Sequence, residues 1–307
     1  MDRFESMTVL LAAVETGSLS AAGRKLGMPL ATVSRKVSEL EAHLKARLLS
    51  RSTRKLTLTD AGREYVVACK RILEYMSEAE RAASGEYSAP RGELIITAPI
   101  VFGRLHVLPV ISEFLKAYPE VDVRLVLGDR IANLMEDQVD LAVRIGELPD
   151  SSLIATRVGT IRHVVCGSPA YFAEYGTPKS PNELTAHRCI TFAALMSPNA
   201  WTFDVNGSNI SVPIRSRLTV NTAEAAIDAA VSGVGVTRVL SYQIEAARRA
   251  DLLRVVLGEF ESTPIPVSLV YTSQGRLPQK LRAFLDFAAP RLREQLDMRS
   301  QSGVKQT

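Results

Sequence analysis

The sequence predicts a multidomain α+β protein with an N-terminal winged helix-turn-helix, a long helix after it, and a larger C-terminal α/β domain. Three observations support this prediction. Residues 17–44 have the capping and spacing of two short helices joined by a glycine turn. Residues 61–84 repeat apolar side chains in heptads. From residue 93 onward, β-rich segments alternate with helical ones.

The helix pair is marked by its ends and by one apolar stripe. Ser18 stands at an N-cap position, Gly27 can end a helix and reverse the chain, and Pro29 suits the first turn of the next helix. The stripe of the second helix is formed by Val33, Val37, Leu40 and Leu44. A preceding helix offers it a packing face made of Phe4, Met7, Leu11 and Val14.

The opposite face of the second helix is polar. A helix braced in this way across a glycine turn has the geometry that enters the major groove of DNA. Arg35 could pair with guanine and Thr32 could hydrogen-bond a base edge. The residues expected to contact DNA here are Ser18, Ser20, Ala31, Thr32, Ser34, Arg35 and Lys36. An ordinary helical hairpin in a packed domain is the alternative interpretation of the two-helix pattern alone.

Residues 47–58 read as two short strands around a basic turn, which predicts a β-hairpin wing. Arg51, Arg54 and Lys55 would then lie along a phosphate backbone, whereas the alternative is a solvated basic loop. Its position next to the helix pair favours the wing, and the charge distribution favours DNA binding by this part of the chain. Residues 1–60 hold ten Lys+Arg and six Asp+Glu, and the remaining chain holds 27 of each, so the whole net charge of +4 lies on the first fifth.

Thr59 and Asp60 can cap a long helix over about 61–84. Its heptad seam consists of Tyr65, Cys69, Ile72, Met76, Ala79 and Ala83. Self-pairing along this seam would give a homodimer whose two recognition helices match a pseudo-palindromic site in double-stranded DNA. The alternative is packing on its own domain. Pro and Gly in residues 86–92 predict a boundary, which gives domains at 1–60, 61–89 and 90–300 and a disordered tail at 301–307.

The C-terminal region is predicted to be a mainly parallel sheet covered by helices. Strands are expected at 93–98, 121–127 and 140–145, with helices at 102–117 and 131–136. In such sheets ligands bind beyond the carboxyl ends of strands. The junctions at 97–101, 144–146 and 221–222 are therefore candidate ligand positions, although every α/β protein has such turns.

Composition narrows the function classes. With 46% hydrophobic and 23% charged residues and no apolar run near the ~18 residues of a membrane span, we expect a soluble cytoplasmic protein without membrane contact. Three dispersed cysteines and four histidines lack metal spacing, so no cofactor is expected. No nucleophile or phosphate-loop motif supports an enzyme. A ligand-binding protein or metabolic enzyme whose N-terminal region serves assembly is the second hypothesis.

The residues resemble the LysR-type transcriptional regulators of bacteria. The N-terminal likeness rests on Gly17-Ser18-Leu19-Ser20-Ala21-Ala22, Val33-Ser34, Leu40-Glu41, Leu48, Arg51, Arg54 and Leu58-Thr59-Asp60-Ala61-Gly62. The C-terminal likeness rests on Leu108-Pro109, Phe114, Tyr118-Pro119, Asp140-Leu141-Ala142-Val143-Arg144, Gly233-Val234-Gly235, Leu277-Pro278 and Phe284. Together they cover nearly the whole chain.

This resemblance implies a dimerising linker helix and a two-lobed effector domain like a periplasmic binding protein, in dimers or tetramers. Lobe I would span about 92–161 and 267–296 and lobe II about 162–266, with crossings near 161–163 and 266–269. A small-molecule effector, modulating a sequence-specific regulator, would sit between the lobes. Its lining would be Thr97, Ala98, Pro99, Ile100, Val101, Phe102, Arg144, Gly146, Asn221 and Thr222.

Two positions depart from the family pattern. The recognition helix usually opens with serine and proline, where this chain has Pro29-Leu30-Ala31. Many members have a hydroxyl after the first effector strand, where this chain has Pro99-Ile100-Val101 and leaves Thr97 as the nearest hydroxyl. Backbone N–H groups could still hold a carboxylate. These residues favour an aromatic or more apolar effector.

Overall fold

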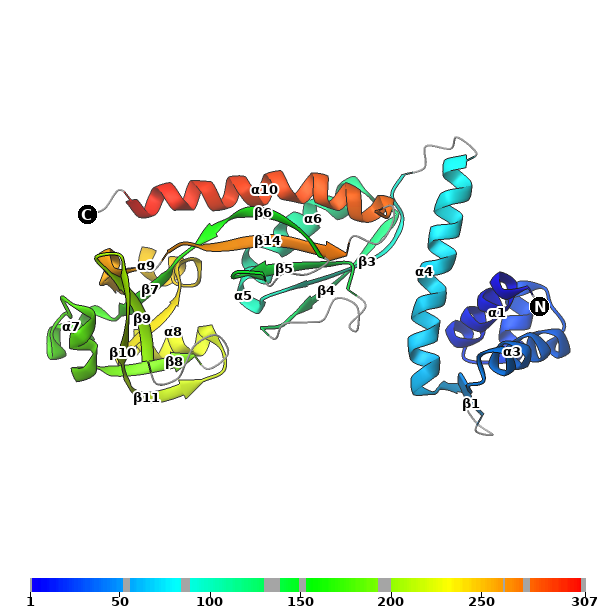
Figure 1. Ribbon diagram of the computed structural model, residues 1–307, viewed down its shortest axis with the longest axis horizontal. Helices are drawn as coiled ribbons and strands as arrows, with labels where there is room; N and C mark the ends of the chain where they lie inside the picture. The colour runs from blue at the N-terminus through cyan, green and yellow to red at the C-terminus, as the bar shows by residue number, and fades with distance from the viewer. Residues whose placement is uncertain are drawn as a thin grey trace. The chain divides into compact units, whose positions relative to one another are not determined.

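A computed structural model describes residues 2–51, 56–83, 89–129, 139–148, 153–192, 200–261, 263–272 and 277–304 (Figure 1). The chain divides into two compact units, Met1–Ser88 and Ala89–Thr307. None of the helices in the described ranges is long and apolar enough to cross a bilayer.

The N-terminal unit has the order of a winged helix-turn-helix. Its elements are α1 (Arg3–Thr16), α2 (Leu19–Leu26), α3 (Leu30–Leu44), β1 (Leu49–Arg51), β2 (Leu56–Leu58) and α4 (Asp60–Ala83). The Ser18 hydroxyl accepts a hydrogen bond from the Ala21 N–H at 3.0 Å, which confirms the expected cap of α2. Gly27, at φ 65°, ends α2 in the left-handed region. The wing strands pair antiparallel, with Leu49 opposite Leu58.

The buried residues of this unit confirm the predicted apolar stripe of α3. On α1 the buried face differs from the predicted one. Val33, Val37 and Leu40 are fully buried. On α1 the buried residues are Ser6, Met7, Val9, Leu10, Ala12 and Ala13. Phe4 is exposed, contrary to its place in the expected packing face, because the first turn of α1 lies at the edge of the core. The first turns of α4 add Val66 and Cys69 to the same cluster.

The C-terminal unit contains two five-stranded sheets, each forming one lobe. The first lobe has the strand order β4-β3-β5-β14-β6. Its elements are β3 (Gly92–Ala98), α5 (Ile100–Phe102), the π-helix η1 (Gly103–Val107), α6 (Leu108–Ala117), β4 (Val121–Leu127), β5 (Leu141–Ile145), β6 (Leu153–Ile161), β14 (Ile265–Thr272) and α10 (Gln279–Val304). Helices α6 and α10 pack on each other, and α10 runs along β6.

The second lobe has the strand order β11-β8-β12-β7-β13, with a separate β9-β10 hairpin. Its elements are β7 (His163–Gly167), α7 (Pro169–Tyr175), η2 (Pro181–Ala186), β8 (Arg188–Phe192), β9 (Ala200–Val205), β10 (Ser208–Pro213), β11 (Arg215–Val220), α8 (Ala223–Val231), β12 (Val236–Leu240), η3 (Ser241–Gln243), α9 (Glu245–Arg249), β13 (Arg254–Val256) and η4 (Gly258–Phe260).

The chain crosses between the lobes twice. The first crossing is at Arg162, as expected, and the second lies between η4 and β14, a few residues before the expected position. Each sheet is mixed, which corrects the expectation of mainly parallel sheets. Strand β14 runs antiparallel to β5 and β6, and β12 runs antiparallel to β7. The reason is topological. Strands β7 and β14 are the first strands after the two crossings, and each runs in the opposite direction to both of its neighbours.

Two further expectations concern the remaining segments. The helix expected at 131–136 lies outside the described residues. The expected disordered tail is wrong for residues 301–304, because α10 continues to Val304, and residues 305–307 lie outside the description. No proline follows Pro290 in this stretch, so the local sequence does not force an end to the helix at residue 300.

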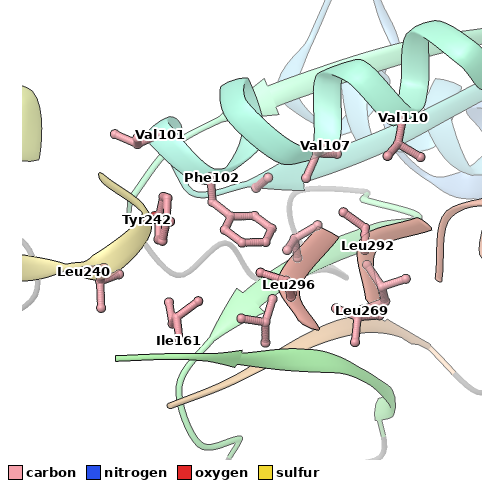
Figure 2. Packing of buried hydrophobic residues seen from close by; sticks show 14 of the residues in the cluster. Val101, Phe102, Val107, Val110, Ile161, Leu240, Tyr242, Leu269, Leu292 and Leu296 are labelled. Atoms are coloured by element: carbon pink, nitrogen blue, oxygen red, sulfur yellow. The ribbon is translucent and has the colours of Figure 1, made fainter. Parts of the chain in front are cut away.

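One apolar core connects the two lobes. Phe102 and Val107 from the first lobe belong to the same buried cluster as Leu240 and Tyr242 from the second (Figure 2). The Phe102 and Tyr242 rings meet edge to face, with centroids 5.3 Å apart. Shared packing of this kind fixes how the two lobes lie at the junction.

Candidate functional site

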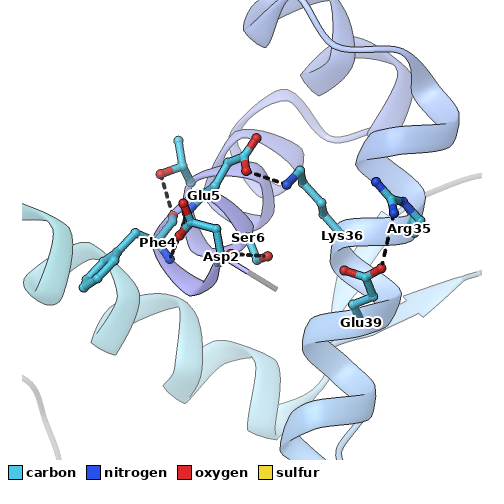
Figure 3. Close-up of polar contacts among 8 residues, drawn as sticks. Asp2, Phe4, Glu5, Ser6, Arg35, Lys36 and Glu39 are labelled. Atoms are coloured by element: carbon cyan, nitrogen blue, oxygen red, sulfur yellow. Dashed lines mark hydrogen bonds and ion pairs between the residues drawn. The ribbon is translucent and has the colours of Figure 1, made fainter.

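The exposed face of α3 holds most of the residues expected to read DNA. Ala31 and Arg35 are exposed, and Thr32 and Ser34 are partly exposed. The Arg35 side chain is 67% exposed and lies 3.7 Å from the Glu39 carboxylate along the same helix (Figure 3). A surface pair of this length is weak, so the guanidinium can leave it to meet a base.

The environment of Lys36 differs from the expectation that its side chain is open to DNA. Its Nζ donates to Glu5 Oε2 on α1 at 2.5 Å, and its side chain is only 14% exposed (Figure 3). Lys36 therefore fixes α3 against α1 and is not an open contact for DNA. Sequence spacing could not show this, because Glu5 lies 31 residues away in the chain.

The two serines of α2 are already engaged within the helix. Ser18 caps α2 through the hydrogen bond to Ala21. The exposed Ser20 hydroxyl accepts a hydrogen bond from Arg24 Nη1 at 3.0 Å. Both lie at the start of α2, where a hydroxyl can also donate to a phosphate.

The wing is tied to α3 by a residue that the motif analysis did not assign. Glu41 Oε1 accepts hydrogen bonds from the backbone N–H groups of Leu48 and Leu49, at 2.8 and 3.0 Å. On the other side, the Thr59 hydroxyl donates to Arg47 O at 2.6 Å. Arg54 and Lys55 lie outside the described residues, and for Arg51 only the backbone in β1 is described. The wing strands are thus positioned by α3 and by the start of α4.

The heptad seam of α4 is divided between two roles, which corrects the expectation of one continuous dimer seam. Cys69 is fully buried and Tyr65 packs partly buried in the core of its own unit, because α1 contacts the first turns of α4. Ile72, Met76 and Ala79 are exposed on the following turns. Ala83 ends the helix, and its side chain lies outside the description.

In the first lobe, the expected effector positions lie at the carboxyl ends of the parallel strands β3 and β5. Thr97 is buried and its hydroxyl donates to Val126 O at 3.0 Å, so it holds the sheet together. Pro99 precedes α5 without a side-chain cap. Val101 and Phe102 are buried in the core and Ile100 is partly buried.

The remaining first-lobe positions lie on the backbone around this edge. Ala98 ends β3 and its carbonyl accepts from the Gly128 N–H at 3.0 Å. Arg144 lies near the end of β5, opposite Ser268 of β14. Gly146, at φ 121°, follows this strand and donates its N–H to Pro266 O at 3.0 Å, a backbone conformation that favours glycine.

The expected effector positions of the second lobe, Asn221 and Thr222, lie at the start of α8. Thr222 caps α8, because its hydroxyl accepts from the Ala225 N–H at 3.3 Å, and Asn221 before it is exposed. In the first turn of α8, Glu224 lies 3.7 Å from Arg104 of η1. This ion pair joins the two lobes and places the start of α8 against the first-lobe segment that follows α5.

Asp129 lies at the same edge as the expected effector positions, and the sequence analysis did not name it. Its Oδ1 accepts a hydrogen bond from the Ile100 N–H at 3.1 Å, so a carboxylate of the protein already occupies this amide. Burial raises the pKa of Tyr242, and the negative charges of Asp129 and Glu224 add to this effect. The rule that ligands bind beyond strand ends could have identified Asp129, since it lies two residues after the end of β4.

A second charged cluster lies where the chain crosses between the lobes. Burial raises the pKa of Glu261 to about 7, against the opposing charges of Arg162 and Arg238. Burial likewise lowers the pKa of Arg238 to about 10, and its guanidinium lies 5.3 Å from the Phe203 ring centroid. Burial, aided by the charge of Arg238, lowers the pKa of His163 to about 4.

Comparisons with known proteins agree with this arrangement over most of the chain. Residues 4–63 match the family model for bacterial regulatory helix-turn-helix proteins of the lysR family, and residues 88–293 match the LysR substrate binding domain. The chain is similar to an HTH-type transcriptional regulator of Xanthomonas campestris, at 36% identity over 92% of this chain and 84% of that protein. It is also similar to a transcriptional repressor of Pseudomonas aeruginosa, at 32% identity over 94% and 91%.

A solved relative has the same architecture. The structure of CrgA, a LysR-type transcriptional regulator from Neisseria meningitidis, aligns with a TM-score of 0.60 at 33% identity, covering 94% of this chain and 98% of that one. The helix-turn-helix, the two-lobed domain and these likenesses together lead to one conclusion. The chain belongs to the LysR family of bacterial transcriptional regulators, with a helix-turn-helix for DNA and an effector-binding domain.

Proposed function

We propose that this regulator binds a pseudo-palindromic operator as a homodimer or homotetramer, and that a small effector at the lobe junction changes the spacing of its DNA-reading units. It acts in the cytoplasm and without catalysis. The observation that supports the DNA-binding role most is the exposed face of α3, where the Arg35 side chain is open within residues 1–60, the part of the chain with a net charge of +4.

Two contributions to DNA binding are separable. Arg35, Thr32, Ser34 and Ala31 face outward from α3 and supply base contacts. Arg51, Arg54 and Lys55 of the wing, with the hydroxyls of α2, supply phosphate contacts that set the register of the protein on the duplex. Lys36 has no direct contact in this proposal, because Glu5 holds it.

Self-assembly uses the second half of α4. Ile72, Tyr75 and Met76 are 39%, 46% and 37% exposed. Three large apolar side chains within five residues of a helix form a stripe that a second copy can cover. Two copies joined there carry two recognition helices, as a pseudo-palindromic operator requires.

The hydrogen bonds that the lobe junction already makes within the protein indicate which class of effector it would bind. The Thr97 hydroxyl is used by Val126, and the Ile100 amide is used by the Asp129 carboxylate. A carboxylate effector at that amide must first displace Asp129, against charge repulsion. Pro99 and Ile100 at the same edge are apolar and only partly buried, so they offer apolar contacts instead. Between the two classes that the sequence left open, the contacts favour a neutral aromatic effector.

The DNA-binding proposal is tested by gel shift of the full chain on the DNA upstream of its own gene, against a scrambled duplex of equal length. We expect a shift that the scrambled DNA does not compete away. Arg35→Ala should weaken it, and Arg215→Ala, at an exposed position of the second lobe, should not. Equal binding of both duplexes by the wild-type protein, with and without metabolite extract, would refute the proposal and favour a ligand-binding protein or enzyme.

The effector proposal has its own measurement. The melting temperature of the full chain, followed by the fluorescence of Trp201 in the second lobe, is recorded with benzyl alcohol, benzoate and benzylamine. A ligand that binds only the folded state raises this temperature. We expect the neutral aromatic to raise it most, and an increase with benzoate alone would contradict the assignment.

A further inference from the structure

Lys45 has a backbone conformation that is unusual for lysine. It follows α3 directly, at φ 53° and ψ 29°, in the left-handed region where the end of a helix usually has glycine. Its N–H donates to Ala42 O at 3.3 Å, and the Ala46 N–H donates to Glu41 O at 3.2 Å. Lys45 therefore closes the last turn of α3, although its Cβ is strained in a conformation that suits glycine.

Three other residues with side chains share this conformation in the described part of the chain, and each has an evident reason. Asn206 and Asp251, both at φ 54°, are of the residue types that tolerate it best. Leu257, at φ 58°, is buried and packs in the core of the second lobe. Lys45 is exposed, and within the described residues its side chain has no ion pair or hydrogen bond. Contacts in this part of the protein therefore do not explain a lysine here.

The position of Lys45 continues the exposed line of α3 that carries Arg35. Five exposed residues follow one another at spacings of four, three, four and three, namely Ala31, Arg35, Ser38, Ala42 and Lys45. This spacing keeps them on one side of the helix. Ten residues separate Arg35 from Lys45, which is about 15 Å along the axis, whereas the major groove is about 12 Å wide. When Arg35 reaches a base edge, Lys45 therefore lies at the border of the groove, where the phosphates are.

Lys45 also begins the connection from α3 to the wing. Glu41 fixes this connection by accepting the N–H groups of Leu48 and Leu49, and Arg47 on it is a second exposed cation. We propose that Lys45 binds a phosphate of duplex DNA in each half-site, and that its charge is the reason for a lysine in a strained position. This inference rests on the proposed DNA binding by α3.

The test is Lys45→Gly, which removes the charge and relieves the strain together. Operator affinity of the full chain is measured between about 50 and 200 mM salt. We expect the slope of log affinity against log salt to become less negative by about 0.9 per subunit, so that the loss of affinity is about threefold larger per subunit at the lower salt. The melting temperature should rise or stay within about 3 °C of wild type, because glycine is favoured at this position.

Three further variants separate charge from conformation. Lys45→Arg keeps the charge and should keep the wild-type salt slope. Lys45→Asn removes the charge, tolerates the left-handed conformation, and should repeat the result of the glycine variant. Lys179→Gln removes an exposed lysine of the second lobe and should change neither slope nor stability.

The alternative role of Lys45 is to offset the negative end of the dipole of α3. A wild-type salt slope in Lys45→Gly, or a melting temperature lower by more than about 3 °C, would overturn the inference, because the lysine would then serve the fold. A wild-type protein that does not prefer its operator over scrambled DNA would overturn the proposed function instead.

Discussion

Gly62 of α4 lies against the backbone of Leu48 at the start of the wing. Replacing Gly62 with alanine should therefore destabilise the protein, although the same change in an isolated helix would stabilise it. Gly62 lies in the first turn of α4, where alanine is normally the better residue by about 1 kcal/mol. In this protein an added Cβ would stand 2.0 Å from Leu48 O and 2.8 Å from Leu48 C. Both atoms are backbone, so relief requires the wing or the helix to move.

The expected loss exceeds the gain in helix propensity. The Leu48 carbonyl accepts a hydrogen bond from the Thr59 N–H at 3.0 Å, which the displaced wing would weaken. Overpacking costs about 1–3 kcal/mol, and weakening this hydrogen bond costs about 1 kcal/mol. After the alanine preference is subtracted, Gly62→Ala should lower the stability of the N-terminal unit by about 2 kcal/mol.

Scanning calorimetry of the full chain measures this loss, with Gly128→Ala as the control because an added Cβ there meets nothing within 4 Å. The N-terminal transition should fall by about 10 °C, while the Trp201 fluorescence transition of the second lobe stays in place. Operator affinity should fall too, since the wing is displaced. A Gly62→Ala protein as stable as wild type would refute the close contact.

Three further predictions follow from the same structure. Arg35→Ala should cost about 1–3 kcal/mol of operator binding in gel shifts at constant melting temperature, whereas Lys36→Ala should mainly lower stability, by about 1 kcal/mol. Because burial raises the pKa of Glu261 from 4.5 to about 7, the native chain keeps a proton that the unfolded chain loses, so stability falls with rising pH through that window. The difference in melting temperature between Glu261→Gln and wild type should therefore grow in favour of the variant from pH 5 to pH 8. The three buried cysteines, whose thiol pKa values burial raises to about 11–12, should react with a disulfide reagent only after denaturation.

Local signals in the sequence predicted the elements well. The Ser18 cap, the Gly27 turn and the stripe of Val33, Val37 and Leu40 each depend on neighbours within one or two helical turns. Such neighbours are fixed once a helix forms, so spacing alone identifies them. The same holds for β3 and β4 and for the cap of α8 by Thr222.

Partners distant in the sequence were not predictable in this way. Lys36 and Arg35 are adjacent and chemically alike, yet only Lys36 meets Glu5, because the crossing of α1 and α3 decides which cation turns inward. The heptads of α4 had a similar ambiguity. A buried stripe shows that a helix has a partner, and it does not show whether that partner is α1 or a second copy.

The division of α4 also indicates how an effector signal can reach DNA. Its first turns share the core of the recognition unit through Cys69, while Ile72 and Met76 on later turns are free to pair with another copy. The close contact of Gly62 with Leu48 and the hydrogen bonds from Glu41 to the wing leave little freedom between this helix and the DNA-reading face. A change in how two α4 helices pair must therefore move wing and recognition helix together, as one rigid body. In the proposed assembly an effector would therefore have to alter only the angle at which two α4 helices pair, because no internal rearrangement of the DNA-binding unit is needed to change half-site spacing.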